Sequence, residues 1–116
     1  MKYNLNNKQF VTIGNEHGLS SSETVFHYSQ SGEIITGQYG GGEIVEGCFV
    51  GRFTSPDRIE LLFQCVTKTS KLLAGKSSGQ ISTSASGKLH LSFDWQWLHG
   101  DEGGGTSSYV ERGMMG

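Results

Sequence analysis

The sequence KLHLSFDWQWL, residues 88–98, has the clearest pattern in the chain and decides the fold. Its apolar residues occur at every second position, which puts Leu91, Phe93 and Trp95 on one face and the intervening polar residues on the other. Strict alternation of this kind is typical of a β-strand that buries one face and exposes the other. We therefore expect a strand here, with both Trp95 and Trp97 facing the interior.

Seven other runs rich in β-branched or aromatic residues follow the same plan, and none shows a sustained helical period. Polar or glycine-containing segments, most of them short, separate these runs. The further expected strands are residues 9–13, 23–30, 33–40, 43–53, 58–68, 71–84 and 106–112. Eight strands with mainly short connections predict an antiparallel up-and-down meander.

A flat sheet of eight strands would leave its apolar face exposed, and the sequence offers no helix to cover it. Closing the sheet into a barrel buries that face and pairs both edges. A β-sandwich is the alternative, but sandwiches usually need longer crossings between their sheets. The sequence thus predicts an all-β fold, a single small eight-stranded antiparallel barrel domain over residues 1–116.

The expected strand 43–53 is unusual because glycines alternate with large residues on its inward face. That face would carry Val45, Phe49 and Phe53, with glycines at positions 47 and 51. Glycine in a strand allows the sharp bend that a barrel wall requires. We therefore expect this strand to curve strongly.

The composition bears on partners and location. Charged residues make up only 17% of the 116 residues, the net charge is −2, and no basic run is present. The electrostatic attraction that drives nucleic-acid binding is therefore missing. The N-terminal sequence MKYNLNNKQF lacks the apolar core of a signal peptide, and no apolar run is long enough to cross a bilayer. We expect a cytoplasmic protein that binds neither nucleic acid nor membranes.

The two cysteines are expected to be reduced. A hairpin at residues 54–57 would put Phe53 and Ile59 on one face, and Cys48 and Cys65 then point to opposite faces and cannot form a disulfide. Two isolated thiols are also too few to hold a structural zinc ion. We expect no metal or other cofactor.

Two longer stretches resemble a known group of proteins. These are SSETVFHYSQSGEIITGQYGGGEIVEG, residues 21–47, and DWQWLHGDEGGGTSS, residues 94–108. They are similar to short bacterial proteins that often carry the label N-acetylglutamate synthase and that look like avidin-type or lipocalin-like small barrels. The resemblance covers residues 20–111 and implies the same barrel, but it brings no catalytic residues to this chain.

The synthase label implies an acetyl-coenzyme A enzyme of the α/β class. Such an enzyme binds the pyrophosphate at a helix N-terminus. Both glycine-rich loops here, residues 39–43 and 100–107, lead into expected strands and carry carboxylates that would repel phosphate. We interpret them as turns at the barrel mouth, and we do not expect acetyl transfer.

Other catalytic or metal sites find little support. His17 and His99 fall in expected loops at the same end of the barrel, beside Glu16 and Asp101, but no HxH or HxxxH spacing indicates a metal, and we favour solvated histidines. There is no GxSxG nucleophile elbow. The carboxylates of the strands point outward and do not form the facing pair that acid–base catalysis requires; these are Glu46, Glu60 and Asp94. The sequence gives no support to an enzyme.

Aromatic residues inside a small barrel either fill the core or line a pocket. The expected inward residues of the sixth and eighth strands are small and partly polar, which favours a cavity; they are Gly75, Ser77, Gly79, Thr106 and Ser108. We expect non-enzymatic binding of a small apolar or aromatic molecule. Its lining would be Trp95, Trp97, Phe26, Tyr28, Tyr39, Phe49 and Phe63.

The competing interpretation is a packed structural barrel that acts through oligomerisation, with a homodimer as the expected assembly. An exposed apolar patch on the outer face would mark such an interface. The outward residues at which we expect it are Val25, His27, Val66 and Leu98.

Overall fold

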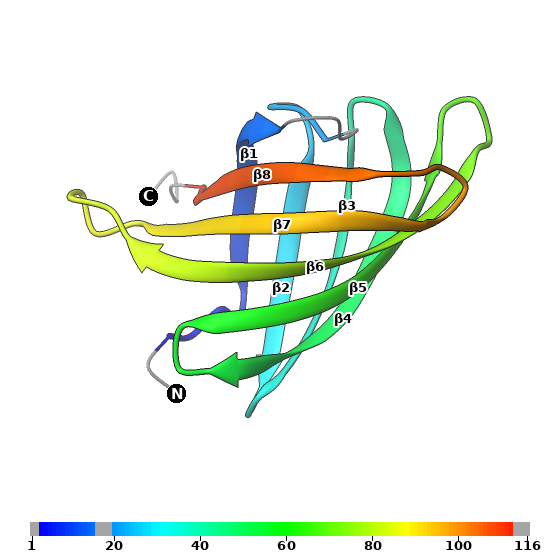
Figure 1. Cartoon of the computed structure of the whole chain (residues 1–116). Coiled ribbons are helices and arrows are strands. Elements are labelled where there is room, and N and C mark those ends of the chain that lie inside the picture. Colours follow the sequence, from blue (N-terminus) through cyan, green and yellow to red (C-terminus); the bar gives the residue numbers. More distant parts are fainter. Residues whose placement is uncertain (1–2, 16–19, 113–116) are drawn as a thin grey trace.

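The computed structural model describes residues 3–15 and 20–112, which form one closed antiparallel barrel of eight strands (Figure 1). The strands are β1 Lys8–Asn15, β2 Val25–Ser31, β3 Ile34–Gly41, β4 Ile44–Ser55, β5 Arg58–Thr67, β6 Leu72–Thr83, β7 Leu89–His99 and β8 Gly104–Glu111. Each strand pairs with the next, and β8 pairs with β1. The predicted eight-stranded meander barrel is confirmed.

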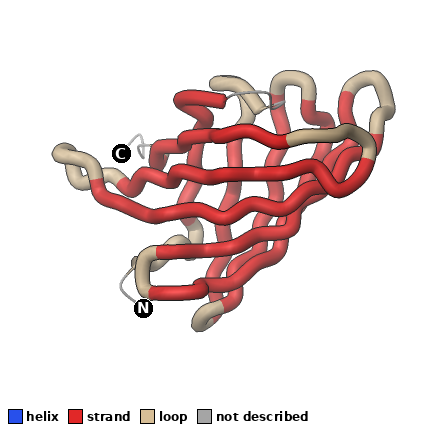
Figure 2. Tube along the Cα trace, in the orientation of Figure 1, coloured by secondary structure: helices blue, strands red, loops and turns tan. Residues whose placement is uncertain are grey.

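The connections gather at two ends of the barrel (Figures 1 and 2). The connections β1–β2, β3–β4, β5–β6 and β7–β8 lie at one end, which we call the loop end, and the other three lie at the opposite end. Both glycine-rich segments contain a turn at the loop end, as expected, although residues 39–41 belong to β3 and 104–107 to β8. In these turns Gly42 and Gly103 have the positive φ of left-handed backbone.

The end opposite the loop end is filled by side chains. The segment before β1 runs across it, where Leu5 is fully buried and its N–H donates to Gln30 Oε1 at 2.8 Å. Apolar residues from five strands pack there with almost no exposed surface; they are Phe10, Ile35, Ile59, Ile81 and Leu91. The sequence pattern predicted no structural role for the segment before β1, because a single buried leucine does not form a periodic pattern. The barrel is therefore closed at this end.

One expected inward position in β4 and the expected inward face of β8 were wrong. Val45 is 60% exposed because the β4–β5 pairing shifts between Ile44 and Glu46, and this bulge turns Ile44 inward instead. In β8 the inward residues are Ser107 and Tyr109, whose partners in β7 are Phe93 and Leu91. The expected inward residues of that strand were its other set, Thr106 and Ser108. Polar residues occupy both faces of β8, so alternation carried no signal there.

Inside the barrel, aromatic rings lie over glycines of the neighbouring strand. The cross-strand partners are Gly37 and Phe49, Tyr39 and Gly47, Phe63 and Gly75, and Gly79 and Phe93. A Cβ atom added at any of these glycines would collide with the ring of its partner. The rings therefore lie against the barrel wall, and space remains along the axis.

Candidate functional site

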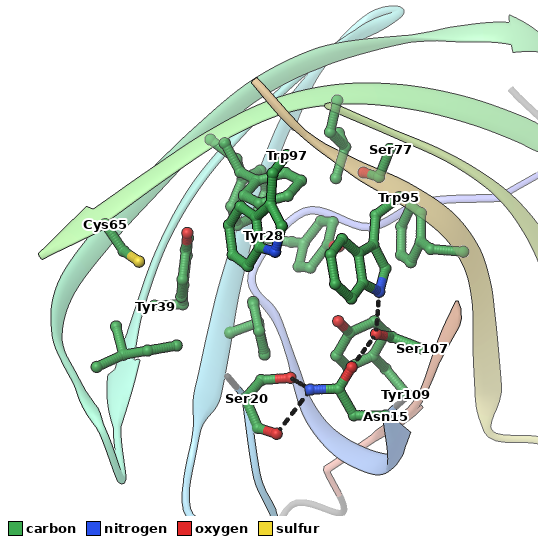
Figure 3. Close-up of a pocket in the computed structure, with 16 residues that line it drawn as sticks. Asn15, Ser20, Tyr28, Tyr39, Cys65, Ser77, Trp95, Trp97, Ser107 and Tyr109 are labelled. Atoms are coloured by element: carbon green, nitrogen blue, oxygen red, sulfur yellow. Dashed lines mark hydrogen bonds between the residues drawn. The ribbon is translucent and has the colours of Figure 1, made fainter. Parts of the chain in front are cut away.

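A cavity of about 80 Å³ lies inside the barrel toward the loop end (Figure 3). Asn15 at the end of β1, Ser20 in the following loop and Ile44 at the start of β4 border it on that side. All eight strands contribute to its lining, which comprises Asn15, Ser20, Phe26, Tyr28, Tyr39, Ile44, Phe49, Leu61, Phe63, Cys65, Ser77, Phe93, Trp95, Trp97, Ser107 and Tyr109. The seven residues predicted to line a lumen all border this cavity, and their role in binding stays a prediction.

The aromatic part of the lining is held by contacts between rings. Trp95 and Trp97 meet edge to face, with centroids 5.1 Å apart, and Trp97 makes a similar contact with Phe63 at 5.9 Å. On the opposite wall the rings of Phe26 and Tyr39 stack at 4.8 Å. Such pairs favour one arrangement by about 0.5–1.5 kcal/mol each beyond the area they bury. These contacts favour one arrangement of the rings that line the cavity.

A chain of hydrogen bonds runs along one side of the cavity (Figure 3). Trp95 Nε1 donates to Ser107 Oγ at 2.9 Å, and Ser107 Oγ donates to Asn15 Oδ1 at 2.6 Å. Asn15 Nδ2 in turn donates to the backbone oxygen of Ser20 at 2.9 Å and to its Oγ at 3.1 Å. This chain connects β7, β8 and β1 with the first loop, and it gives the apolar cavity one polar side.

Tyr109 lies at the same side of the cavity. Burial raises the pKa of its hydroxyl, although hydrogen bonds to Ser107 and Ser20 act in the opposite direction. Its ring also contacts the rings of Phe26 and Phe93 edge to face. Tyr109 therefore joins the aromatic wall to the polar side and stays protonated at neutral pH.

The opposite wall contains a second hydroxyl and a thiol. Tyr39 donates its hydroxyl hydrogen to the backbone oxygen of Gln64 at 3.1 Å. Burial is the main reason why the pKa of Tyr39 is raised, and burial likewise raises the pKa of the neighbouring Cys65 thiol. A thiol in such surroundings is a poor nucleophile. Cys48 is exposed on the other face of the barrel, so the two cysteines are free, as expected.

Sequence reasoning missed the polar side of the cavity. Asn15 lies beyond the predicted first strand, and Ser107 and Tyr109 were obscured by the wrong face of the last strand. The signal that would have found them is the pairing of β7 with β8: Trp95 lies opposite Gly105, so odd-numbered residues of β8 share the inward face of Trp95.

The other candidate groups lie outside the cavity. His99 is exposed, Asp101 pairs with Lys71 at 3.6 Å, and Glu16 and His17 lie outside the described residues. Within residues 3–15 and 20–112, no three metal-ligating side chains come together. Glu46, Glu60 and Asp94 are exposed on the outer face. Within the described part of the chain, no helix is long and apolar enough to cross a membrane.

The closed barrel and its internal cavity define a class of small proteins that enclose space within one antiparallel sheet. The chain belongs to the avidin-like family: the model of that family, described as "Avidin-like protein", matches residues 3–112. No curated protein and no solved structure matches the chain. The avidin-like resemblance of the sequence is confirmed, and none of these findings supports the acetyltransferase label.

Proposed function

We propose that the barrel binds a small, partly apolar molecule in its cavity without catalysing a reaction. The observation that carries this proposal is a cavity whose aromatic rings are backed by glycines and whose one polar side is a prearranged hydrogen-bond chain. Apolar walls with a few fixed polar groups are typical of small-molecule sites. The family match agrees with this reading at the level of the barrel.

The position of the cavity supports binding over simple packing. Its far end is sealed by fully buried residues, so the fold does not need the remaining space to be filled for closure. A molecule that entered would displace water from aromatic surface, which favours binding. The same molecule could exchange hydrogen bonds with the side that contains Ser107 and Tyr109.

The test is a ligand screen read by tryptophan fluorescence and thermal shift, because Trp95 and Trp97 both border the cavity. Hits are then measured against Tyr109→Phe, which keeps the ring but removes the hydroxyl, and against the outward control Val110→Thr. We expect weaker binding in the first variant alone. A screen without hits, or hits that both variants bind as well as the wild type does, would reject the proposal.

A second candidate function, association with another copy through the outer face, also has an observation in its favour. Ile34, Val50 and Leu62 are each more than half exposed, and Val50 and Leu62 are direct cross-strand partners. Exposed apolar patches on a sheet mark interfaces when they are contiguous.

This patch differs from the expected one. Val25 and Val66 are partly buried and so contribute little, whereas Leu98 and His27 are exposed as expected. Light scattering during size-exclusion chromatography of the wild type and of Leu62→Glu tests the homodimer. Leu72→Glu, the same change at another exposed leucine, is the control. A monomeric wild-type protein would reject this function.

The remaining sequence-based expectations stay predictions. These are the cytoplasmic location and the absence of nucleic-acid and membrane partners, both of which rest on the low charge and the N-terminal composition.

A further inference from the structure

The described part of the cavity lining contains no formal charge. Among the described residues that border it, none is Asp, Glu, Lys, Arg or His. The titratable groups there are three tyrosines and Cys65, and burial raises the pKa of each, which keeps them neutral at physiological pH. A charged ligand would therefore find no counter-charge among the described lining residues.

The polar groups on the side of the lining that contains Asn15 are committed to one another. The indole N–H of Trp95 and the hydroxyl hydrogen of Ser107 are both used within the chain that ends at Asn15. The Asn15 amide donates to Ser20. An anion needs several free donors to replace its hydration shell, and this side of the cavity does not supply them.

Aromatic rings can attract a cation through their faces. Here Phe26 and Tyr39 each have one face covered because the two rings stack, and the ring of Phe63 lies against Gly75. Among the lining residues that the structure describes, no carboxylate is present to complete a site for a cation. With no counter-charge among the described lining residues, the cavity disfavours either sign of charge.

We infer that the cavity selects uncharged ligands, so that the part of the molecule inside the barrel carries no net charge. This inference rests on the proposed binding function. It concerns the buried part alone, since a charged group that remains outside the loop end stays in water. The ligand class is thus a small neutral molecule with apolar surface and at most a few hydrogen-bonding atoms.

The test is a screen built from pairs of molecules that share a shape and differ in charge. Benzamide and benzoate form one pair, and 3,3-dimethylbutan-1-ol and choline form the other, in which a carbon replaces the cationic nitrogen. Binding to the wild-type protein is measured by calorimetry and thermal shift. We expect the charged member to bind at least about 100-fold more weakly than its neutral partner, because an unpaired charge is costly to bury.

The outcomes separate the inference from the function. If a charged member binds as tightly as its neutral partner, the inference is wrong and the binding function stands. If no molecule in this screen or in the broader one binds, the function itself is rejected and the inference falls with it. Binding by neutral members alone supports both.

A variant extends the test. Ser77 lines the cavity on β6, and Ser78 next to it points outward. Ser77→Asp places a carboxylate against the cavity, and we expect it to improve choline binding by about tenfold or more over the wild type. Ser78→Asp adds the same charge outside and should leave choline binding unchanged. An equal gain in both variants would show that surface charge, not the cavity, governs selectivity.

Discussion

The ring of Tyr39 lies over the backbone of Gly47, its direct partner across β3 and β4. The glycine leaves room for the ring to rest against the wall, and the Tyr39 hydroxyl reaches over to the backbone of β5. The same arrangement recurs where Phe63 meets Gly75. These pairs explain how a barrel with many aromatic residues keeps an internal cavity.

Gly47→Ala is expected to lower the free energy of unfolding by about 1–3 kcal/mol, the usual cost of overpacking a core. The added methyl would collide with the Tyr39 ring and push it into the cavity. Denaturant unfolding measures the loss. Gly14→Ala is the matched control, because a Cβ there meets nothing within 4 Å and its φ is not positive. Equal stability in the two variants would contradict the role of Gly47.

Ser107→Ala is expected to cost about 1–3 kcal/mol, because it leaves the buried Trp95 N–H without its acceptor. Ser108→Ala, at the outward neighbour, should stay within about 0.5 kcal/mol of the wild type. Thermal unfolding followed by tryptophan fluorescence reports both stability and the surroundings of the indole. A variant at position 107 as stable as the one at 108 would show that the hydrogen-bond chain contributes nothing.

Thr12→Val is expected to stabilise the protein by about 1 kcal/mol. In the described part of the chain, the buried Thr12 hydroxyl has no hydrogen-bond partner. Replacing it with a methyl group therefore removes a desolvation cost that no hydrogen bond compensates. Thr24→Val is the opposite case. The Thr24 hydroxyl accepts from the N–H of Ser21 and donates to the backbone oxygen of Gly41, each at 3.1 Å, so its loss should destabilise. Equilibrium unfolding in urea distinguishes the signs.

From the contacts of Glu111 we predict that acid lowers the stability of the protein where β1 pairs with β8. Its carboxylate accepts a hydrogen bond from the Leu89 N–H at 3.0 Å and pairs with Lys8 Nζ at 3.2 Å. These contacts, the Leu89 bond first, hold the pKa of Glu111 below its ordinary value of 4.5. The stabilising contribution is therefore complete above that value and disappears as the pH falls through the lower pKa of the folded state.

The measurement for Glu111 is the thermal unfolding temperature of the wild type and of Glu111→Gln across the acidic range. The wild type should be more stable near neutral pH, and the difference should shrink below about pH 4. Glu60→Gln is the control, because its partner Arg52 lies beside it on the exposed outer face, where ion pairs contribute little. A difference that does not change with pH would contradict the assignment.

The barrel could be predicted because its strongest strands alternate strictly. In β7 the inward set from Leu91 to Trp97 is apolar throughout, which fixes its face without knowledge of its neighbours. The closed topology followed from that face and from the lack of helices to cover it. The aromatic side of the cavity was predictable for the same reason.

The position of Val45 and the polar side of the cavity could not be predicted, because they depend on how neighbouring strands pair, which the sequence of one strand does not reveal. The bulge that turns Val45 outward lies in the register of β4 with β5, and bulges leave little trace in composition. Asn15 meets Ser107 only because β1 closes against β8, a contact between opposite ends of the chain, and Ser20 is linked to Ser107 through Asn15. Polar residues without periodicity could not be assigned to a face.

The sealed end beneath Leu5 gives the barrel a direction. In the proposed function, a bound molecule would have an inner tip, limited in length by the closed end, and an outer tip toward the loop end. A group too long for the interior would then lie outside the barrel. Under the same proposal, the protein would be able to hold a small molecule whose outer tip is attached to something much larger.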